Sequence, residues 1–85
     1  MATREAKEAL VGGQLRGRDV RALRTRLGLT RTAFAERYGL DVRTVEGWEQ
    51  ERFSMDRTAR VLILVIAHEP DAVARTLRRV KAAGR

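Results

Sequence analysis

The sequence predicts an all-α fold of five helices, and three observations support that prediction. Alanine, leucine, arginine and glutamate dominate the composition, all of them favour helices, and the chain contains a single proline. From position 19 onward, apolar residues recur three or four positions apart, which is the spacing of one helix face. Residues that commonly begin or end helices separate these stretches. With 85 residues, the chain is long enough for one domain.

The first three helices are placed by their boundary residues. Asp19 is the expected N-cap of the first helix, which ends at Gly28. Thr30 and Asp41 are the expected N-caps of the second and third helices, because each stands just before a short amphipathic stretch. Gly39 ends the second helix and supplies the left-handed conformation that a tight turn requires.

Two further helices and an N-terminal segment complete the expected organisation. A fourth helix is expected from Ser54 or Asp56 to about His68, and Pro70 suits the first turn of a fifth. Residues 1–18 are interpreted as an N-terminal segment and linker, with a possible short helix over 1–11. Residues 19–82 are interpreted as one domain whose last helices mediate dimerisation.

The second and third helices carry the most specific pattern in the sequence. Two short helices joined by a tight turn can cross closely only if a small residue lies at the crossing point and apolar residues anchor both helices. Ala35 is the small residue, Gly39 allows the turn, and the apolar anchors are Phe34, Val45 and Trp48. This combination within eighteen positions predicts a helix-turn-helix.

The segments RALRTRLGLTRTAFAERYGLDVRTVEGWEQ and ARVLILVIAHEPDAV resemble the lambda-repressor-like (Xre) helix-turn-helix family. The resemblance is strongest to the branch of small HigA-like antitoxins and related transcriptional regulators, which are encoded beside RelE-type toxins. It implies a five-helix fold, a symmetric homodimer, and binding to a palindromic operator in double-stranded DNA. It further implies that the protein represses its own promoter and that a RelE-like toxin is a possible partner.

The resemblance also places candidate DNA contacts on this chain. Arg31 stands where the family often has a glutamine that contacts a phosphate, and Arg43 lies near the start of the recognition helix, where arginine can pair with guanine. Glu46 and Glu49 are expected to brace a neighbouring arginine, with a contact to cytosine as the alternative. Val42, Arg43, Thr44 and Gly47 match the exposed, groove-facing positions of the recognition helix, which is the expected third helix. The expected DNA-binding residues are Thr30, Arg31, Thr32, Val42, Arg43, Thr44, Gly47 and Arg52.

One departure from the family pattern concerns position 51. The family commonly has glycine directly after Trp-Glu-Gln, and this chain has Glu51. If position 51 adopts a left-handed backbone, glutamate is mildly unfavourable there.

The expected fourth helix is apolar on nearly every side, through the run VLILVIA. One stripe, formed by Leu62, Ile63 and Ile66, can enter the core of a monomer. A second face remains, and a dimer interface explains it better than full burial in so small a protein. The expected interface residues are Val61, Leu64 and Val65.

Composition restricts the remaining function classes. The net charge of +7 favours a polyanionic partner, but residues 19–52 hold seven arginines against six acids, so the expected DNA-reading segment is nearly neutral. A helix-turn-helix fold that binds proteins without binding DNA is therefore the alternative function.

The absence of cysteine and the single histidine favour neither a metal site nor a cofactor, and no arrangement of catalytic residues indicates an enzyme. With no signal peptide or membrane-length apolar run, a cytoplasmic location is expected.

Overall fold

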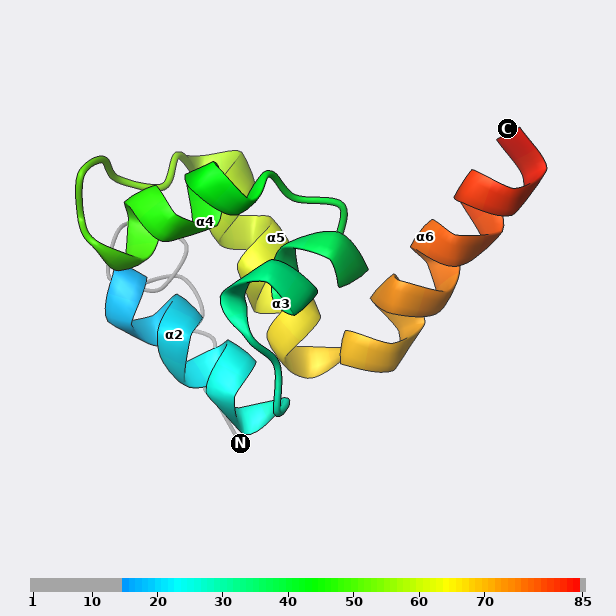
Figure 1. Cartoon of the computed structure of the whole chain (residues 1–85), viewed down its shortest axis with the longest axis horizontal. Helices are drawn as coiled ribbons and strands as arrows, with labels where there is room; N and C mark the ends of the chain where they lie inside the picture. Colours follow the sequence, from blue (N-terminus) through cyan, green and yellow to red (C-terminus); the bar gives the residue numbers. More distant parts are fainter. Residues whose placement is uncertain (1–14, 85) are drawn as a thin grey trace.

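The computed structural model describes residues 15–84, with side chains through residue 82, and that part of the chain is all α-helical. Figure 1 shows α2, α3, α4 and α5 packed together, with α6 extending away from them. The short helix considered for residues 1–11 lies outside the described residues. The five helices are α2 (Gly17–Arg26), α3 (Arg31–Arg37), α4 (Val42–Glu49), α5 (Arg57–His68) and α6 (Pro70–Gly84).

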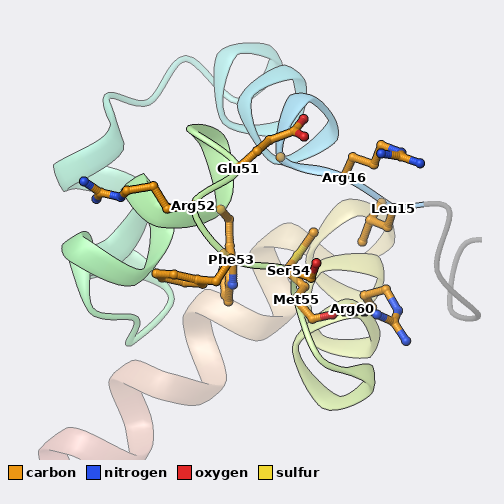
Figure 2. Close-up of a pocket in the computed structure, with 10 residues that line it drawn as sticks. Leu15, Arg16, Glu51, Arg52, Phe53, Ser54, Met55 and Arg60 are labelled. Atoms are coloured by element: carbon orange, nitrogen blue, oxygen red, sulfur yellow. Dashed lines mark hydrogen bonds between the residues drawn. The ribbon is translucent and has the colours of Figure 1, made fainter.

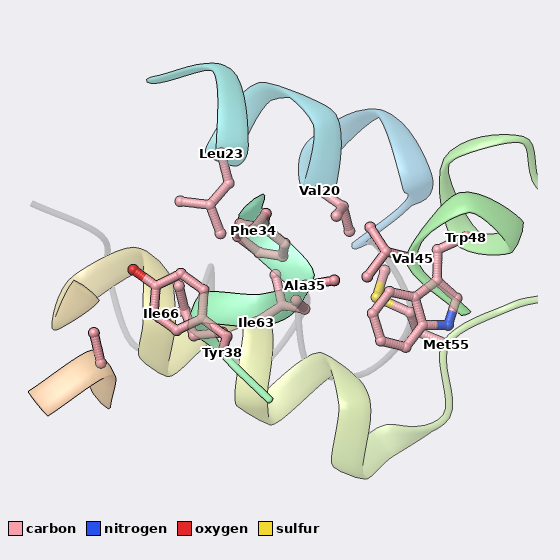
Figure 3. Packing of buried hydrophobic residues seen from close by; sticks show 11 residues of the cluster. Val20, Leu23, Phe34, Ala35, Tyr38, Val45, Trp48, Met55, Ile63 and Ile66 are labelled. Atoms are coloured by element: carbon pink, nitrogen blue, oxygen red, sulfur yellow. The ribbon is translucent and has the colours of Figure 1, made fainter. Parts of the chain in front are cut away.

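One apolar core holds the helices together (Figure 3), and the side chains that form it come from every helix and from the loop before α5. Phe34 of α3 and Tyr38, the residue directly after that helix, both belong to it, and their rings lie 5.1 Å apart and tilted. Burial of this apolar surface supplies most of the stabilisation that such a small domain has. The buried residues are Val20, Leu23, Phe34, Ala35, Tyr38, Val45, Trp48, Met55, Ile63, Ile66 and Ala74.

The N-terminal ends of the helices agree with the sequence prediction at three of four positions. Thr30 Oγ1 accepts a hydrogen bond from the backbone of Ala33, and Asp41 and Asp56 cap α4 and α5 in the same way. The expectation for Asp19 was wrong by one turn. The helix already begins at Gly17, inside the expected linker, and Asp19 lies in its first turn, where its carboxylate accepts a hydrogen bond from the backbone of Arg16 at 2.7 Å.

Three of the helices end in the same hydrogen-bonded turn. After α2, α3 and α4, two backbone N–H groups bond back to carbonyls of the last helical turn, which is the Schellman motif. The left-handed residue of this motif is a glycine after α2 (Gly28, φ 74°) and after α3 (Gly39, φ 66°). After α4 it is Glu51, at φ 57°. The structure therefore confirms that position 51 adopts the conformation in which glutamate is unfavourable.

The start of α2 lies directly against the end of α4. Gly17 is buried, and a methyl group in place of its hydrogen would overlap the backbone carbonyl of Trp48. This contact requires glycine because the two backbones approach more closely than any side chain allows. It fixes α4 at its C-terminal end.

Side-chain hydrogen bonds hold the junction between α5 and α6. The hydroxyl of Tyr38 donates to the carbonyl of Pro70 at 3.2 Å, and the guanidinium of Arg26 donates to the carbonyl of Ala67 at 3.0 Å. Beyond the junction, α6 buries Ala74 but leaves Val80 63% exposed. Within the described residues, neither α6 nor any other helix is long and apolar enough to span a membrane.

Candidate nucleic-acid interface

The pair α3 and α4 has the geometry that the sequence predicted for a helix-turn-helix. Phe34 and Ala35 are buried at the crossing, and Gly39 makes the turn, followed by a hydrogen bond from the backbone of Leu40 to the carbonyl of Ala35 at 2.8 Å. Val45 and Trp48 direct one face of α4 into the core. Trp48 is thus a core residue, as its spacing from Val45 predicted, and the other face of α4 points away from the core.

The N-terminal end of α4 is the part of this helix that solvent reaches most freely. Val42 is 38% exposed, Arg43 is exposed, and Thr44 is half-buried. Thr30 and Thr32 are exposed at the start of α3. Val42 and Arg43 are therefore accessible to a duplex, whereas the side chain of Thr44 is accessible only in part.

Gly47 differs from the expectation. It was expected to be exposed and to face a DNA groove, but it is buried, and the ring of Phe53 lies over its α-carbon. A methyl group at position 47 would overlap that ring, so glycine is explained by packing against the loop after α4. The expected exposure of Gly47 was wrong for this reason.

Arg52 and Phe53 belong to that loop, which borders a cavity of about 470 Å³ (Figure 2). The cavity also reaches the start of α2 and the side chain of Arg60 in α5. In Figure 2, the guanidinium of Arg52 points away from Arg16 and Arg60. The side chain of Arg52 is 55% exposed, so it is available to an incoming phosphate.

A buried carboxylate joins α4 to the two preceding helices. The side chain of Glu49 is 2% exposed and accepts two hydrogen bonds from Arg24 of α2, at 2.7 and 3.0 Å. Arg31, the first residue of α3, donates two more to Glu49 Oε1, at 3.3 and 3.2 Å. Burial alone would raise the pKa of Glu49, but the hydrogen bonds from Arg24 and Arg31 outweigh it and hold that pKa below its ordinary value. The hydrogen bond to Glu49 also raises the pKa of Arg24.

The bracing role expected for the two glutamates is confirmed by these contacts. Besides the pairs made by Glu49, the carboxylate of Glu46 lies 3.8 Å from Arg31 and 3.6 Å from Arg52. Two carboxylates therefore restrain Arg31. Its side chain is 28% exposed, so a phosphate can reach it less freely than it can reach Arg52.

The sequence interpretation missed Arg24. Its position four residues after Val20 and three before Leu27, on a mostly apolar face, is the signal that could have identified it.

The second apolar face of α5, formed by Val61, Leu64 and Val65, lies on the surface. Val61 is 43% and Val65 42% exposed, while Leu64 between them is half-buried. Ile63 and Ile66 occupy the opposite side of the helix and are completely buried, as expected of the core-facing stripe. The described residues therefore do not bury α5 completely, and they leave a contiguous apolar strip on its surface without cover.

Comparison with known proteins finds a similarity among solved structures. Neither a protein-family model nor a curated protein sequence matches this chain. Among solved structures, the chain is similar to the crystal structure of an HTH XRE-family like protein from Agrobacterium tumefaciens, with 34% sequence identity and a TM-score of 0.67. The alignment covers 68% of this chain and 94% of the other.

Proposed function

We propose, from the premise that this chain belongs to the XRE-like helix-turn-helix family of DNA-binding transcription regulators, that it is a dimeric, sequence-specific repressor. Regulators of this family are not enzymes, and their general partner is DNA. The observation that carries the proposal is the exposed start of α4, where Val42 and Arg43 face solvent, with Arg31 and Arg52 beside the helix.

The contacts in the proposed complex divide into two kinds. Arg43 reads a base in the major groove, with guanine as its preferred partner, and Val42 can contact a thymine methyl group. Arg31 and Arg52 bind phosphates on either side of the groove, and they position the protein without selecting a sequence. The remaining proposed contacts are those of Thr30, Thr32 and Thr44.

A binding titration tests this function directly. We expect the protein to bind DNA from the region upstream of its own gene more tightly than a random duplex of equal length, and both affinities to fall as salt rises. The nearly neutral segment 19–52 favours a competing function as a protein-binding module. Absence of binding to either duplex at low salt would favour that module and reject the repressor.

We further propose that the protein dimerises through α5. Val61 and Val65 are exposed and Leu64 between them is half-buried, so the described residues leave this apolar strip on the surface. Two copies of α4 on one face of a symmetric dimer reach successive major grooves only about 34 Å apart. The operator is then an inverted repeat with half-site centres about 10 base pairs apart, which footprinting can reveal.

The variant Leu64→Glu tests this interface, since a charge in the strip should produce monomers in light scattering and weaken DNA binding. Thr25→Glu, on an exposed position of α2, is the matched control and should remain dimeric. A dimeric Leu64→Glu variant with normal DNA binding would assign the interface elsewhere.

An antitoxin role is the most specific form of this proposal, and only the family resemblance described above supports it. A small RelE-like toxin encoded by the adjacent gene, and its co-purification with this protein, would support the role. Failure of the two purified proteins to associate would limit the function to regulation.

A further inference from the structure

Glu46 lies on α4 between two arginines that belong to different segments. Its Oε2 is 3.8 Å from Nη1 of Arg31, at the start of α3, and its Oε1 is 3.6 Å from Nη2 of Arg52, in the loop after α4. The amide of Gln50, the residue directly after α4, donates to Oε2 at 3.5 Å. One carboxylate thus pairs with both cations proposed to bind phosphate beside the recognition helix.

The pairs of Glu46 differ in kind from those of Glu49. The side chain of Glu49 is 2% exposed and accepts short hydrogen bonds from Arg24, so loss of this carboxylate would leave a guanidinium that is only 15% exposed without its ionic partner. The side chain of Glu46 is 38% exposed, and its ion pairs are long. Solvent-exposed ion pairs of this geometry are weak, and their partners exchange readily. Arg31 therefore has one fixed acidic partner and one exchangeable partner, and the pair between Arg52 and Glu46 is of the exchangeable kind.

We propose that Glu46 is an internal counter-ion that competes with DNA phosphates for Arg31 and Arg52 and lowers the affinity for DNA of any sequence. This inference rests on the proposed DNA-binding function. Non-specific affinity comes almost entirely from neutralising phosphates and releasing their condensed counter-ions. A carboxylate that already neutralises the two arginines reduces that gain, because DNA must displace it. Discrimination then depends more on base contacts at the start of α4.

The central experiment compares the wild-type protein with Glu46→Gln on a random duplex. Glutamine keeps the shape and removes the charge. We expect about a threefold to tenfold increase in affinity, because two weak ion pairs no longer compete, and a salt dependence steeper by about one released ion. Glu36→Gln is the matched control, since it changes the net charge equally on an exposed position of α3 that faces the groove toward α6. The control should show a much smaller increase.

A second comparison separates competition for the arginines from direct repulsion of DNA. When Arg31 and Arg52 are both changed to alanine, the further change Glu46→Gln should have little effect, since no arginine remains for which it competes. A gain of equal size in that background would show that Glu46 acts by repulsion alone and would overturn the inference. Thermal unfolding of each variant verifies that the fold is kept.

The remaining outcomes are also decisive. If the wild-type protein binds the random duplex and Glu46→Gln binds it no better, the inference is wrong while the proposed function stands. If Glu46→Gln weakens binding to the operator alone, Glu46 contacts a base, such as cytosine, and is not a counter-ion. If the wild-type protein binds no DNA at low salt, the proposed function fails and the inference fails with it.

Discussion

Arg24 of α2 and Glu49 of α4 form a two-point ion pair, with nitrogen–oxygen distances of 2.7 and 3.0 Å, in which the glutamate side chain is only 2% exposed. Because Arg31 donates to the same carboxylate, one side chain connects α2, α3 and α4. The orientation of the proposed recognition helix therefore depends on a charged contact as well as on apolar packing.

The variant Glu49→Gln should lower the free energy of unfolding by about 2 kcal/mol at neutral pH. It leaves Arg24, whose side chain is 15% exposed, without its ionic partner in a largely desolvated position. Chemical denaturation measures the loss. Glu46→Gln is the control, with an expected change below about 0.5 kcal/mol because Glu46 is half-exposed. Equal losses in the two variants would contradict the distinction between a fixed and an exchangeable pair.

The stabilisation by Glu49 should disappear in acid. Its pKa in the folded state is lower than the ordinary value of 4.5, so the unfolded chain takes up a proton at a higher pH than the folded protein does. The contribution is complete above that ordinary value and is lost as the pH falls through the lower pKa of the folded state. Denaturation curves from about pH 7 to about pH 3 should show the wild-type protein and Glu49→Gln converging in stability. A constant difference would mean that this carboxylate does not titrate as its contacts require.

Replacing Glu51 by glycine should stabilise the protein. Position 51 has φ 57°, which costs an L-residue about 1 kcal/mol, partly offset by the greater freedom of glycine in the unfolded chain. We expect a net gain of about 0.5 kcal/mol in the free energy of unfolding, measured by thermal or chemical denaturation. The adjacent change Gln50→Gly, at φ −90°, should instead destabilise the protein. If Gln50→Gly stabilised the protein and Glu51→Gly did not, the positive φ at position 51 would not be a source of strain.

Gly17→Ala should be among the most damaging single changes in the described part of the chain. The new methyl group would overlap the backbone of Trp48, which cannot move without displacing α4, so we expect a loss of about 3 kcal/mol or more. Gly28→Ala meets open space and suffers only from its positive φ, with an expected loss of about 1 kcal/mol. Similar melting temperatures for the two variants would argue against the close approach of α2 and α4.

Arg43→Ala should reduce specific binding and leave non-specific binding nearly unchanged. An arginine that pairs with guanine contributes about 1–3 kcal/mol of discrimination, so operator affinity should fall by that amount. Affinity for a random duplex should change little. Arg37→Ala, which removes the same charge beside the groove between α3 and α6, is the control and should affect neither strongly. Equal losses on both duplexes for Arg43→Ala would make it a phosphate contact.

The local features of this fold were predictable because they depend on residues close in sequence. Caps such as Thr30 and Asp41, and the glycine turn at Gly39, act within one helical turn. The misplaced start of α2 has a local cause too. Asp19 is favourable both as an N-cap and in the first turn, and the sequence pattern does not separate these positions.

The features that were missed depend on contacts between distant segments. Gly47 lies in a helix pattern that gives no indication of Phe53, whose ring reaches it from a loop of irregular backbone. Arg24 pairs with a residue 25 positions away, and only the packing of α2 against α4 brings them together. The bracing role of the glutamates was predictable in kind, because acidic residues near a DNA surface require a cationic partner. The apolar positions around Arg24 mark it as a partly buried cation, but they do not indicate which carboxylate it meets.

The burial of Trp48 has a practical consequence for optical spectroscopy. It is the single tryptophan in the sequence, it is 7% exposed, and its backbone contacts Gly17 at the start of α2. Its fluorescence should be emitted at short wavelength in the folded protein and shift to longer wavelength when α4 separates from the core. Since the indole faces inward while Val42 and Arg43 face outward, the emission should be almost insensitive to ligands that bind the outer face. Each titration of this protein can therefore monitor its own folded fraction without an added dye.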